Sequence, residues 1–420
     1  MVLLALNVFL LLFAYYLVKS VREALVLTQA GAEQKVYLAA VISVVLVFYA
    51  KAFGALARRV DRLRLITAVT LFFALNLCIF FVLDGAGVAL GIPFFVWVGV
   101  FNVSIIAQFW SFANDVYTEW QGRRLFAIVA GGSTLGAVAG SYGAQHLYVP
   151  LGSGPIMLLT AGLLVLSLLL TWLVHRRQAA GAEVLDADDG HRVEREVVGG
   201  AADAFQLVFK SKYLLLIGGI TLMGTLVNTT GEYILDRAIL ESARALVTEG
   251  GAEGLTTERF VGQFKAKFYM WVNILVVTLQ FFVVSRVLKY LGVRIALFAL
   301  PLLALGGYTA MMVAPALMVI FVAKVIENGA DYSIQNTTRQ TLFLVTSRAE
   351  KYEAKALIDT VFFRLGDVTA GALVLLGSTL AFGTRTYIAI LIGALFLWLV
   401  LAVATARAHR ARAPAGGGGP

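Results

Sequence analysis

Long apolar runs, each close to the length of a membrane-spanning helix, recur along the whole chain. A helix needs roughly 20 apolar residues to cross the hydrocarbon core of a bilayer. The runs predict twelve spans, near residues 2–27, 36–55, 64–84, 91–116, 124–148, 155–175, 213–236, 267–288, 293–313, 315–338, 356–382 and 385–407. Helix is the expected spanning form because backbone polar groups in lipid must be paired within the segment.

A polar stretch separates the first six runs from the last six. It contains Arg176, Arg177 and the charged run 186–196. We therefore expect an all-α membrane protein with two parallel six-helix halves. The expected parts are an N-terminal half at 1–175, a cytoplasmic linker at 176–211, a C-terminal half at 212–407 and a disordered tail at 408–420.

Basic residues gather in alternate connections between the predicted spans. The second-to-third connection holds Arg58, Arg59, Arg62 and Arg64, whereas the third-to-fourth holds no Lys or Arg. Connections rich in Lys and Arg stay in the cytoplasm. Both termini are therefore predicted to be cytoplasmic, and the pattern suits a bacterial inner membrane.

Composition excludes several classes of function. The chain is 60% hydrophobic and only 14% charged, against roughly 25% charged in soluble domains. Four histidines and one cysteine give no metal-ligand spacing. We expect no enzyme, no metal, no cofactor and no nucleic-acid partner, and we expect a monomer in the lipid bilayer. The net charge of +9 is consistent with an anionic substrate, although the cytoplasmic connections account for most of it.

Two short segments recur in the two halves. Residues 18–23 end in Glu23 near the end of the first span, and residues 227–232 end in Glu232 at the same place in the seventh. Residues 110–114 in the fourth span match residues 332–336 in the tenth, so that Asn114 corresponds to Asn336. The order of the matches supports a duplicated architecture, which is common among secondary transporters.

Charged residues also lie within the predicted spans. Each costs about 2.5–3.5 kcal/mol at the bilayer centre and usually faces a cavity or a partner. Helix-end snorkelling and structural ion pairs are the alternatives, and Lys324 and Glu327 are spaced for an intrahelical pair. The set comprises Lys19, Arg22, Glu23, Glu232, Lys324, Glu327, Asp331, Arg339, Arg364 and Asp367.

A glycine-rich stretch, residues 131–140, lies inside the fifth predicted span. It lacks the Gly-Lys-Ser/Thr ending of a phosphate-binding loop. Gly132, Gly136 and Gly140 are four residues apart, which is typical of close packing between membrane helices. We therefore predict helix packing here, and transport driven by gradients or exchange.

Four segments resemble the plastid and intracellular-bacterial ATP/ADP translocases, which are nucleotide transporters of major facilitator type. They are residues 19–26, 109–126, 227–232 and 338–366. The resemblance places Arg22 and Arg339 on functional lysines of that family and Glu232 on a functional glutamate. Residues 96–107 contain no Asp or Glu, whereas the family has an acidic residue there. That departure bears on strict ATP/ADP exchange and not on an organic phosphate.

The resemblance implies a secondary transporter that exchanges a nucleotide or related phosphorylated anion by alternating access of two halves. The expected substrate-binding residues are Arg22, Glu232, Arg339, Lys19, Asn114 and Asn336. The expected coupling or gating residues are Glu23, Asp115, Arg123, Arg124, Arg364 and Asp367. A proton-coupled exporter of another small molecule, with Glu23 or Glu232 as the proton site, and a non-transporting scaffold are the alternatives.

Overall fold

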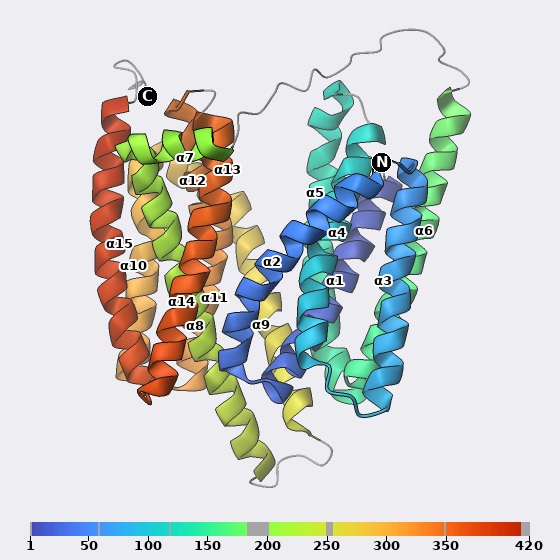
Figure 1. Ribbon diagram of the computed structural model, residues 1–420, viewed down its shortest axis with the longest axis horizontal. Helices are drawn as coiled ribbons and strands as arrows, with labels where there is room; N and C mark the ends of the chain where they lie inside the picture. The colour runs from blue at the N-terminus through green and yellow to red at the C-terminus, as the bar shows by residue number, and fades with distance from the viewer. Residues whose placement is uncertain are drawn as a thin grey trace. The chain divides into compact units, whose positions relative to one another are not determined.

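The computed structural model describes residues 2–57, 59–116, 119–182, 201–248, 255–347 and 350–412, and these residues are almost entirely helical (Figure 1). Each of the twelve predicted spans overlaps helix in the structure. Among the described residues, ten helical stretches are long and apolar enough to cross a membrane. The chain is therefore an integral, multi-pass membrane protein, while the number of twelve spans and the orientation of the termini stay predictions.

The chain divides into two compact units. The first unit comprises Met1–Arg192 and Ile239–Asn273, and the second comprises Val193–Ala238 and Ile274–Pro420. The helix α8 (Lys212–Thr248) therefore begins in the second unit and ends in the first, and α9 (Thr257–Leu279) begins in the first and ends in the second.

Six long helices make up most of the first unit. They are α1 (Val2–Gln29), α2 (Ala32–Ala57), α3 (Arg62–Gly85), α4 (Gly91–Val116), α5 (Glu119–Leu151) and α6 (Ser153–Ala182). A core of apolar side chains from α1, α3, α4, α5 and α6 is fully or almost fully buried. The helix α1 lies at its centre, with buried residues along its whole length.

The glycines of α5 allow it to pack directly against α1. A Cβ atom on Gly132, Gly136 or Gly140 would lie 2.4–2.6 Å from a backbone oxygen of α1. The oxygens belong to Ala5, Phe9 and Phe13, which are also four residues apart. The prediction that this stripe serves helix packing and not phosphate binding is confirmed.

The second unit contains the remaining helices and several π-helical turns. The helices are α7 (Ala201–Lys210), the start of α8, α10 (Gly292–Val313), α11 (Leu317–Ala330), α12 (Asn336–Leu342), α13 (Lys355–Leu357), α14 (Phe363–Thr379) and α15 (Thr384–Arg412). The π-helical turns include Asp331–Gln335, which joins α11 to α12, and Ile358–Phe362, which precedes α14. Such turns interrupt the regular hydrogen bonding and occur frequently at functional sites.

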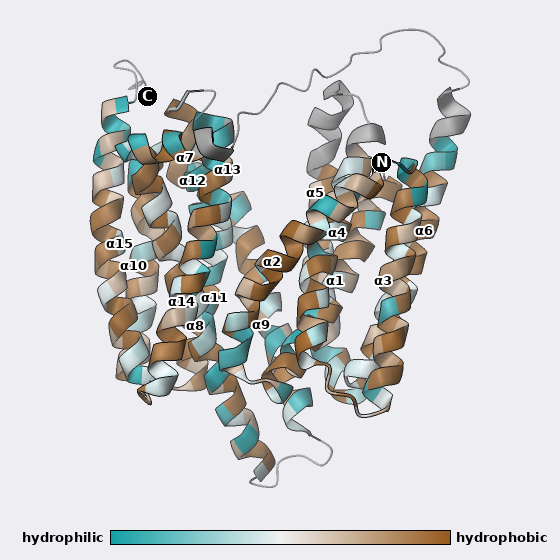
Figure 2. Ribbon diagram, viewed as in Figure 1, coloured by the Kyte–Doolittle hydropathy of each residue, from teal (hydrophilic) through white to brown (hydrophobic). Residues whose placement is uncertain are grey.

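Hydrophobic residues predominate along most of the helices (Figure 2), and many large apolar side chains are exposed. Examples are Phe72 and Leu75 on α3, and Phe396 and Val400 on α15, all of which are more than half exposed. An apolar surface of this extent is unfavourable in water and suits contact with lipid tails.

Candidate functional site

Glu23 in α1 is the centre of a group of basic side chains in the first unit. Its carboxylate is fully buried, and Arg22 donates to Oε1 through both Nε and Nη2. The Nζ atoms of Lys35 and Lys265 lie 2.5 and 3.7 Å from Oε2. We name these four residues the basic cluster. Three cations thus contact one buried carboxylate.

The turn between α1 and α2 brings Lys35 back to Glu23. The N–H groups of Ala30 and Gly31 both donate to Val26 O, at 2.9 and 3.0 Å, and Gly31 has a φ of +90°. Glycine adopts this left-handed conformation without steric cost, and it ends the helix abruptly. Lys35 therefore lies one turn into α2, beside the end of α1.

A polar stripe on α9 faces the first unit. Its members, Lys265, Tyr269 and Asn273, are four residues apart and so lie on one face of the helix. Lys19 Nζ lies 3.8 Å from the ring centroid of Tyr269. Tyr16 OH donates to Asn273 Oδ1 at 3.0 Å. Through its contact with Tyr269, Lys19 adds one further cation beside the basic cluster.

The burial of these charges is the unusual feature of the first unit. The side chains of Glu23 and Lys265 are 0% exposed, and Arg22 is 15% exposed. Buried ion pairs contribute little net stability compared with well-packed apolar residues. Ionisable groups within a membrane are consequently uncommon and usually belong to a substrate or ion pathway.

Two members of the basic cluster were not among the residues selected from the sequence. Lys35 lies close to the predicted start of the second span, and Lys265 falls in the long connection between the seventh and eighth spans. Such positions normally indicate exposed residues near helix ends. The spacing of Lys265 with Tyr269 and Asn273 is the only sequence signal of a common face, and it requires knowing that the helix begins as early as Thr257.

The second unit contains a buried ion pair in which both partners are fully hydrogen-bonded. Lys324 Nζ lies 2.9 Å from Glu327 Oε1 and donates to Asn228 Oδ1 at 2.9 Å. Tyr308 OH donates to Glu327 Oε2 at 3.0 Å. Gly231 leaves room for this network, because a Cβ atom there would lie 1.9 Å from Tyr308 OH. Of the two interpretations of Lys324 and Glu327, the intrahelical pair is the one observed.

The predicted residues of α8 and α14 form further polar contacts in the second unit. Asn328 Nδ2 donates to Glu232 Oε1 at 3.4 Å. Asp367 accepts hydrogen bonds from Thr229 Oγ1 at 2.9 Å and from Arg364 Nη1 at 3.0 Å. Arg364 and Asp367 are therefore an intrahelical pair that also holds α14 to α8.

A cavity of about 160 Å³ lies within the second unit, and we name it the second-unit cavity. Asn336 and Arg339, both selected from the sequence, are in its wall, and Arg339 Nη1 also lies 3.7 Å from Asp359 Oδ1. The other lining residues are Ile220, Thr221, Gly224, Thr225, Asn228, Thr229, Asp331, Tyr332, Gln335, Phe363 and Trp398.

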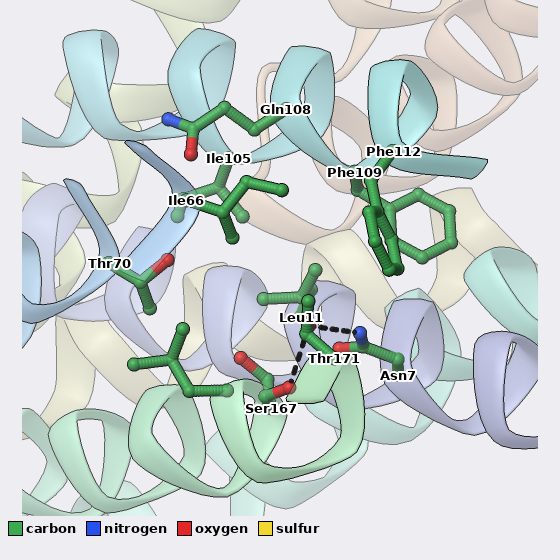
Figure 3. Close-up of a pocket in the computed structure, with 11 residues that line it drawn as sticks. Asn7, Leu11, Ile66, Thr70, Ile105, Gln108, Phe109, Phe112, Ser167 and Thr171 are labelled. Atoms are coloured by element: carbon green, nitrogen blue, oxygen red, sulfur yellow. Dashed lines mark hydrogen bonds between the residues drawn. The ribbon is translucent and has the colours of Figure 1, made fainter. Parts of the chain in front are cut away.

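A much smaller cavity, of about 20 Å³, lies in the first unit between α1, α3, α4 and α6 (Figure 3). Asn7 Nδ2 donates to Thr171 Oγ1 at 2.8 Å in its wall, and the carboxamide of Gln108 is buried without a hydrogen-bond partner. A space of this size holds about one water molecule. It is therefore too small for an organic substrate.

The predicted residues are distributed over both units. Lys19, Arg22 and Glu23 belong to the first unit, and Glu232, Asn336, Arg339, Arg364 and Asp367 belong to the second. The side chains of Asn114, Asp115, Arg123 and Arg124 lie outside the described residues.

The fold is shared with solved membrane transporters. A POT family transporter in complex with 5-aminolevulinic acid aligns over 97% of this chain and 96% of its own, with a TM-score of 0.60 and 13% identity. The nucleoside transporter NupG aligns over 97% and 98%, with a TM-score of 0.58 and 12% identity. A bacterial homologue of the iron transporter ferroportin in the inward-facing state aligns over 96% and 98%, with a TM-score of 0.63 and 14% identity.

At these identities the likeness concerns the fold. No protein-family model matches the sequence, and no curated protein is similar to it. The resemblance to ATP/ADP translocases, drawn from short motifs, stays a prediction. The chain shares its all-helical fold with these solved transporters.

Proposed function

We propose that the protein is a secondary transporter of a phosphorylated organic anion, with nucleotides as the first class to test. The observation that carries the proposal is the basic cluster, in which Arg22, Lys35 and Lys265 share the buried carboxylate of Glu23. A charge within the membrane is costly unless it has a function or a partner. Three basic side chains gathered at one place can donate hydrogen bonds to the oxygens of an anionic substrate.

Arg22 is the residue that contacts the phosphate in this proposal. It is the partly exposed member of the cluster, and its planar guanidinium binds phosphate oxygens in pairs. Its guanidinium also lies 4.7 Å from the ring centroid of Phe95, which orients it. While no substrate is bound, Glu23 is the partner of the three cations. When the phosphate binds, Arg22 exchanges its hydrogen bonds to Glu23 for hydrogen bonds to the phosphate oxygens.

Other predicted residues retain their proposed roles. Asn336 and Arg339 contribute through the second-unit cavity, and Glu232 orients the substrate. Transport proceeds by exchange and alternating access, in a monomer in a bacterial inner membrane. Fold likeness to transporters of other substrates supports transport in general, and the nucleotide assignment depends on the sequence motifs.

The first test is ligand-induced stabilisation of the full-length protein purified in detergent. ATP, ADP, sugar phosphates, pyrophosphate and inorganic phosphate are compared in a thermal-shift series. A ligand at 100 times its dissociation constant adds about 2.7 kcal/mol to the native state. We expect stabilisation by a phosphorylated compound, and its loss in Arg22→Gln.

The matched control is Arg64→Gln, since Arg64 is a first-unit arginine whose side chain is 82% exposed. This variant should respond to the ligand like the unaltered protein. Uptake of the labelled ligand into proteoliposomes loaded with unlabelled ligand then tests exchange. If no phosphorylated compound stabilises the protein, the proposal fails. If uptake instead collapses with a proton uncoupler, the proton-coupled exporter takes its place.

A further inference from the structure

Two helical segments supply most of the wall of the second-unit cavity, one from α8 and the other at residues 331–339. Asp331, Gln335 and Arg339 are four residues apart, and Tyr332 and Asn336 lie beside them. The π-helical turn Asp331–Gln335 widens this face before α12 begins at Asn336. Five consecutive positions of one helix face therefore present a carboxylate, a phenol ring, two carboxamides and a guanidinium to the same space.

Acidic groups outnumber basic ones in and next to this wall. Arg339 is the only cation among the residues that line the second-unit cavity. Asp331 lines the same cavity, and Asp359 lies 3.7 Å from the Arg339 guanidinium. Two carboxylates accompany one guanidinium, so a phosphate group would meet net repulsion here. The cavity is therefore suited to an uncharged polar group.

The polar groups of the wall match hydroxyl groups. A carboxylate only accepts hydrogen bonds, a guanidinium only donates, and a carboxamide does both. Neighbouring hydroxyl groups donate and accept at each oxygen, and so they can use all three kinds of partner. Asp331, Asn336 and Arg339 provide one of each kind, and Asn228 on α8 supplies a further carboxamide.

Aromatic rings also line the cavity, and the space is small. Tyr332 is 51% exposed and Phe363 is 38% exposed, so that both rings are accessible to a ligand. A cavity of about 150 Å³ accommodates a benzene ring, and this cavity measures about 160 Å³. Sites for entire organic ligands are larger, at about 300–1,000 Å³. The space therefore admits one ring of a larger molecule.

We propose that the second-unit cavity binds a single hydroxylated ring, namely the sugar moiety of the transported molecule. Asp331 and Asn336 hold neighbouring hydroxyl groups of the sugar, and Tyr332 packs against the face of the ring. The inference rests on the proposed function only in taking this sugar to be part of the phosphorylated substrate. It makes Asp331 a determinant of specificity, a role that the sequence motifs do not give it.

The test compares ribose 5-phosphate with 2-deoxyribose 5-phosphate as ligands of the full-length protein, by titration in detergent. A hydrogen bond from a hydroxyl to a charged acceptor changes affinity about tenfold or more. We expect the 2-deoxy compound to bind about tenfold more weakly. In Asp331→Asn and in Asn336→Ala this preference should shrink to less than about threefold, while the binding of pyrophosphate is unchanged.

Two controls separate binding from folding. Asn336 is an exposed residue, so Asn336→Ala tests the wall without removing a buried group. Asp61, whose side chain is 78% exposed in the first unit, gives the matched control Asp61→Asn, which should keep the tenfold preference. All variants must elute as a single species in size-exclusion chromatography.

The outcomes distinguish this inference from the proposed function. Equal binding of the two sugar phosphates, or a preference that persists in both cavity variants, overturns the sugar site. If only pyrophosphate binds and Arg22→Gln abolishes that binding, the anion transporter stands and the sugar site falls. If phosphate compounds do not bind but free ribose binds in a manner that depends on Asp331, the sugar site stands and the proposed function falls.

Discussion

The two units hold their buried charge in opposite ways. In the first unit, Glu23 is one carboxylate approached by three cations. In the second unit, Lys324 and Glu327 form a one-to-one pair, and Arg339 is accompanied by two acidic residues. The first unit thus gathers several basic side chains around one acid, whereas the second unit pairs its buried charges one to one or surrounds a cation with acids. In our two proposals this difference corresponds to binding of an anionic group in the first unit and of an uncharged polar group in the second.

The largest effect on stability is expected from Glu23→Gln. This change removes the negative charge that Arg22, Lys35 and Lys265 all contact. Loss of one partner from a buried ion pair costs about 3–5 kcal/mol. The free energy of unfolding, measured by denaturant titration in detergent, should fall by that amount.

Two variants test whether the cluster has an excess of cations. Arg22→Met should cost clearly less than Glu23→Gln, because Lys35 and Lys265 still compensate Glu23. Glu33, an exposed acid in the first turn of α2, provides the control Glu33→Gln with little expected change. Equal losses for Arg22→Met and Glu23→Gln would mean that the cluster is a simple ion pair.

The second unit should behave as a balanced pair. Lys324→Met and Glu327→Leu should each lower the free energy of unfolding by about 3–5 kcal/mol, because each leaves one buried charge alone. The double variant should recover most of that loss, since both charges are then absent. A double-mutant cycle measures the recovery as a coupling free energy. Additive losses would show that the two residues act independently, contrary to the observed 2.9 Å contact.

Helix packing in the first unit is predicted to respond to a single methyl group. Gly136→Ala places a Cβ atom 2.4 Å from Phe9 O. The backbone fixes the positions of both atoms, so neither can rotate away. Overpacking of this kind costs about 1–3 kcal/mol. Gly131 lies in the same helix with nothing within 4 Å of its Cβ position, so Gly131→Ala should be neutral or stabilising, by up to about 1 kcal/mol. A similar loss of thermal stability in both variants would argue against the close α1–α5 contact.

Local patterns in the sequence were sufficient to predict the helices, a stripe of small residues for helix packing and an ion pair within one helix. Each predicted span overlaps helix in the structure. The four-residue spacing of Gly132, Gly136 and Gly140 predicted close helix packing, and the three-residue spacing of Lys324 and Glu327 allowed their ion pair. Each of these features depends on residues that are close in the chain, where helical periodicity alone fixes the geometry.

Contacts between distant helices were not accessible in this way. Lys35 and Lys265 meet at Glu23 from α2 and α9, although 230 positions separate them. Their charge and their positions near span ends favoured an exposed interpretation. Likewise Trp398 reaches the second-unit cavity from α15, far in the chain from Asp331. Burial of these residues follows from tertiary packing, which no local pattern contains.

The smallest predicted effect concerns a contact outside the spanning segments of the second unit. Arg412 at the end of α15 donates to Glu350, with Nη1 lying 3.1 Å from Oε1 and 3.3 Å from Oε2, and to Ser211 Oγ at 3.0 Å. Burial alone would raise the pKa of Glu350, but the Ser347 backbone N–H and Arg412 outweigh it and hold the pKa below its usual value.

A carboxyl group whose pKa is lowered on folding stabilises the protein above its unfolded pKa and loses that contribution as the pH falls through the folded value. Glu350→Gln should therefore lower the free energy of unfolding at pH 7 by less than about 1 kcal/mol, as is typical of partly exposed ion pairs. The difference from the unaltered protein should disappear in acid, below the folded pKa of Glu350. A difference in the free energy of unfolding that is the same at pH 7 and in acid would mean that the Glu350 side chain contributes by its shape and not by its charge. In that case the basic cluster and the Lys324–Glu327 pair would remain the places where charge governs stability.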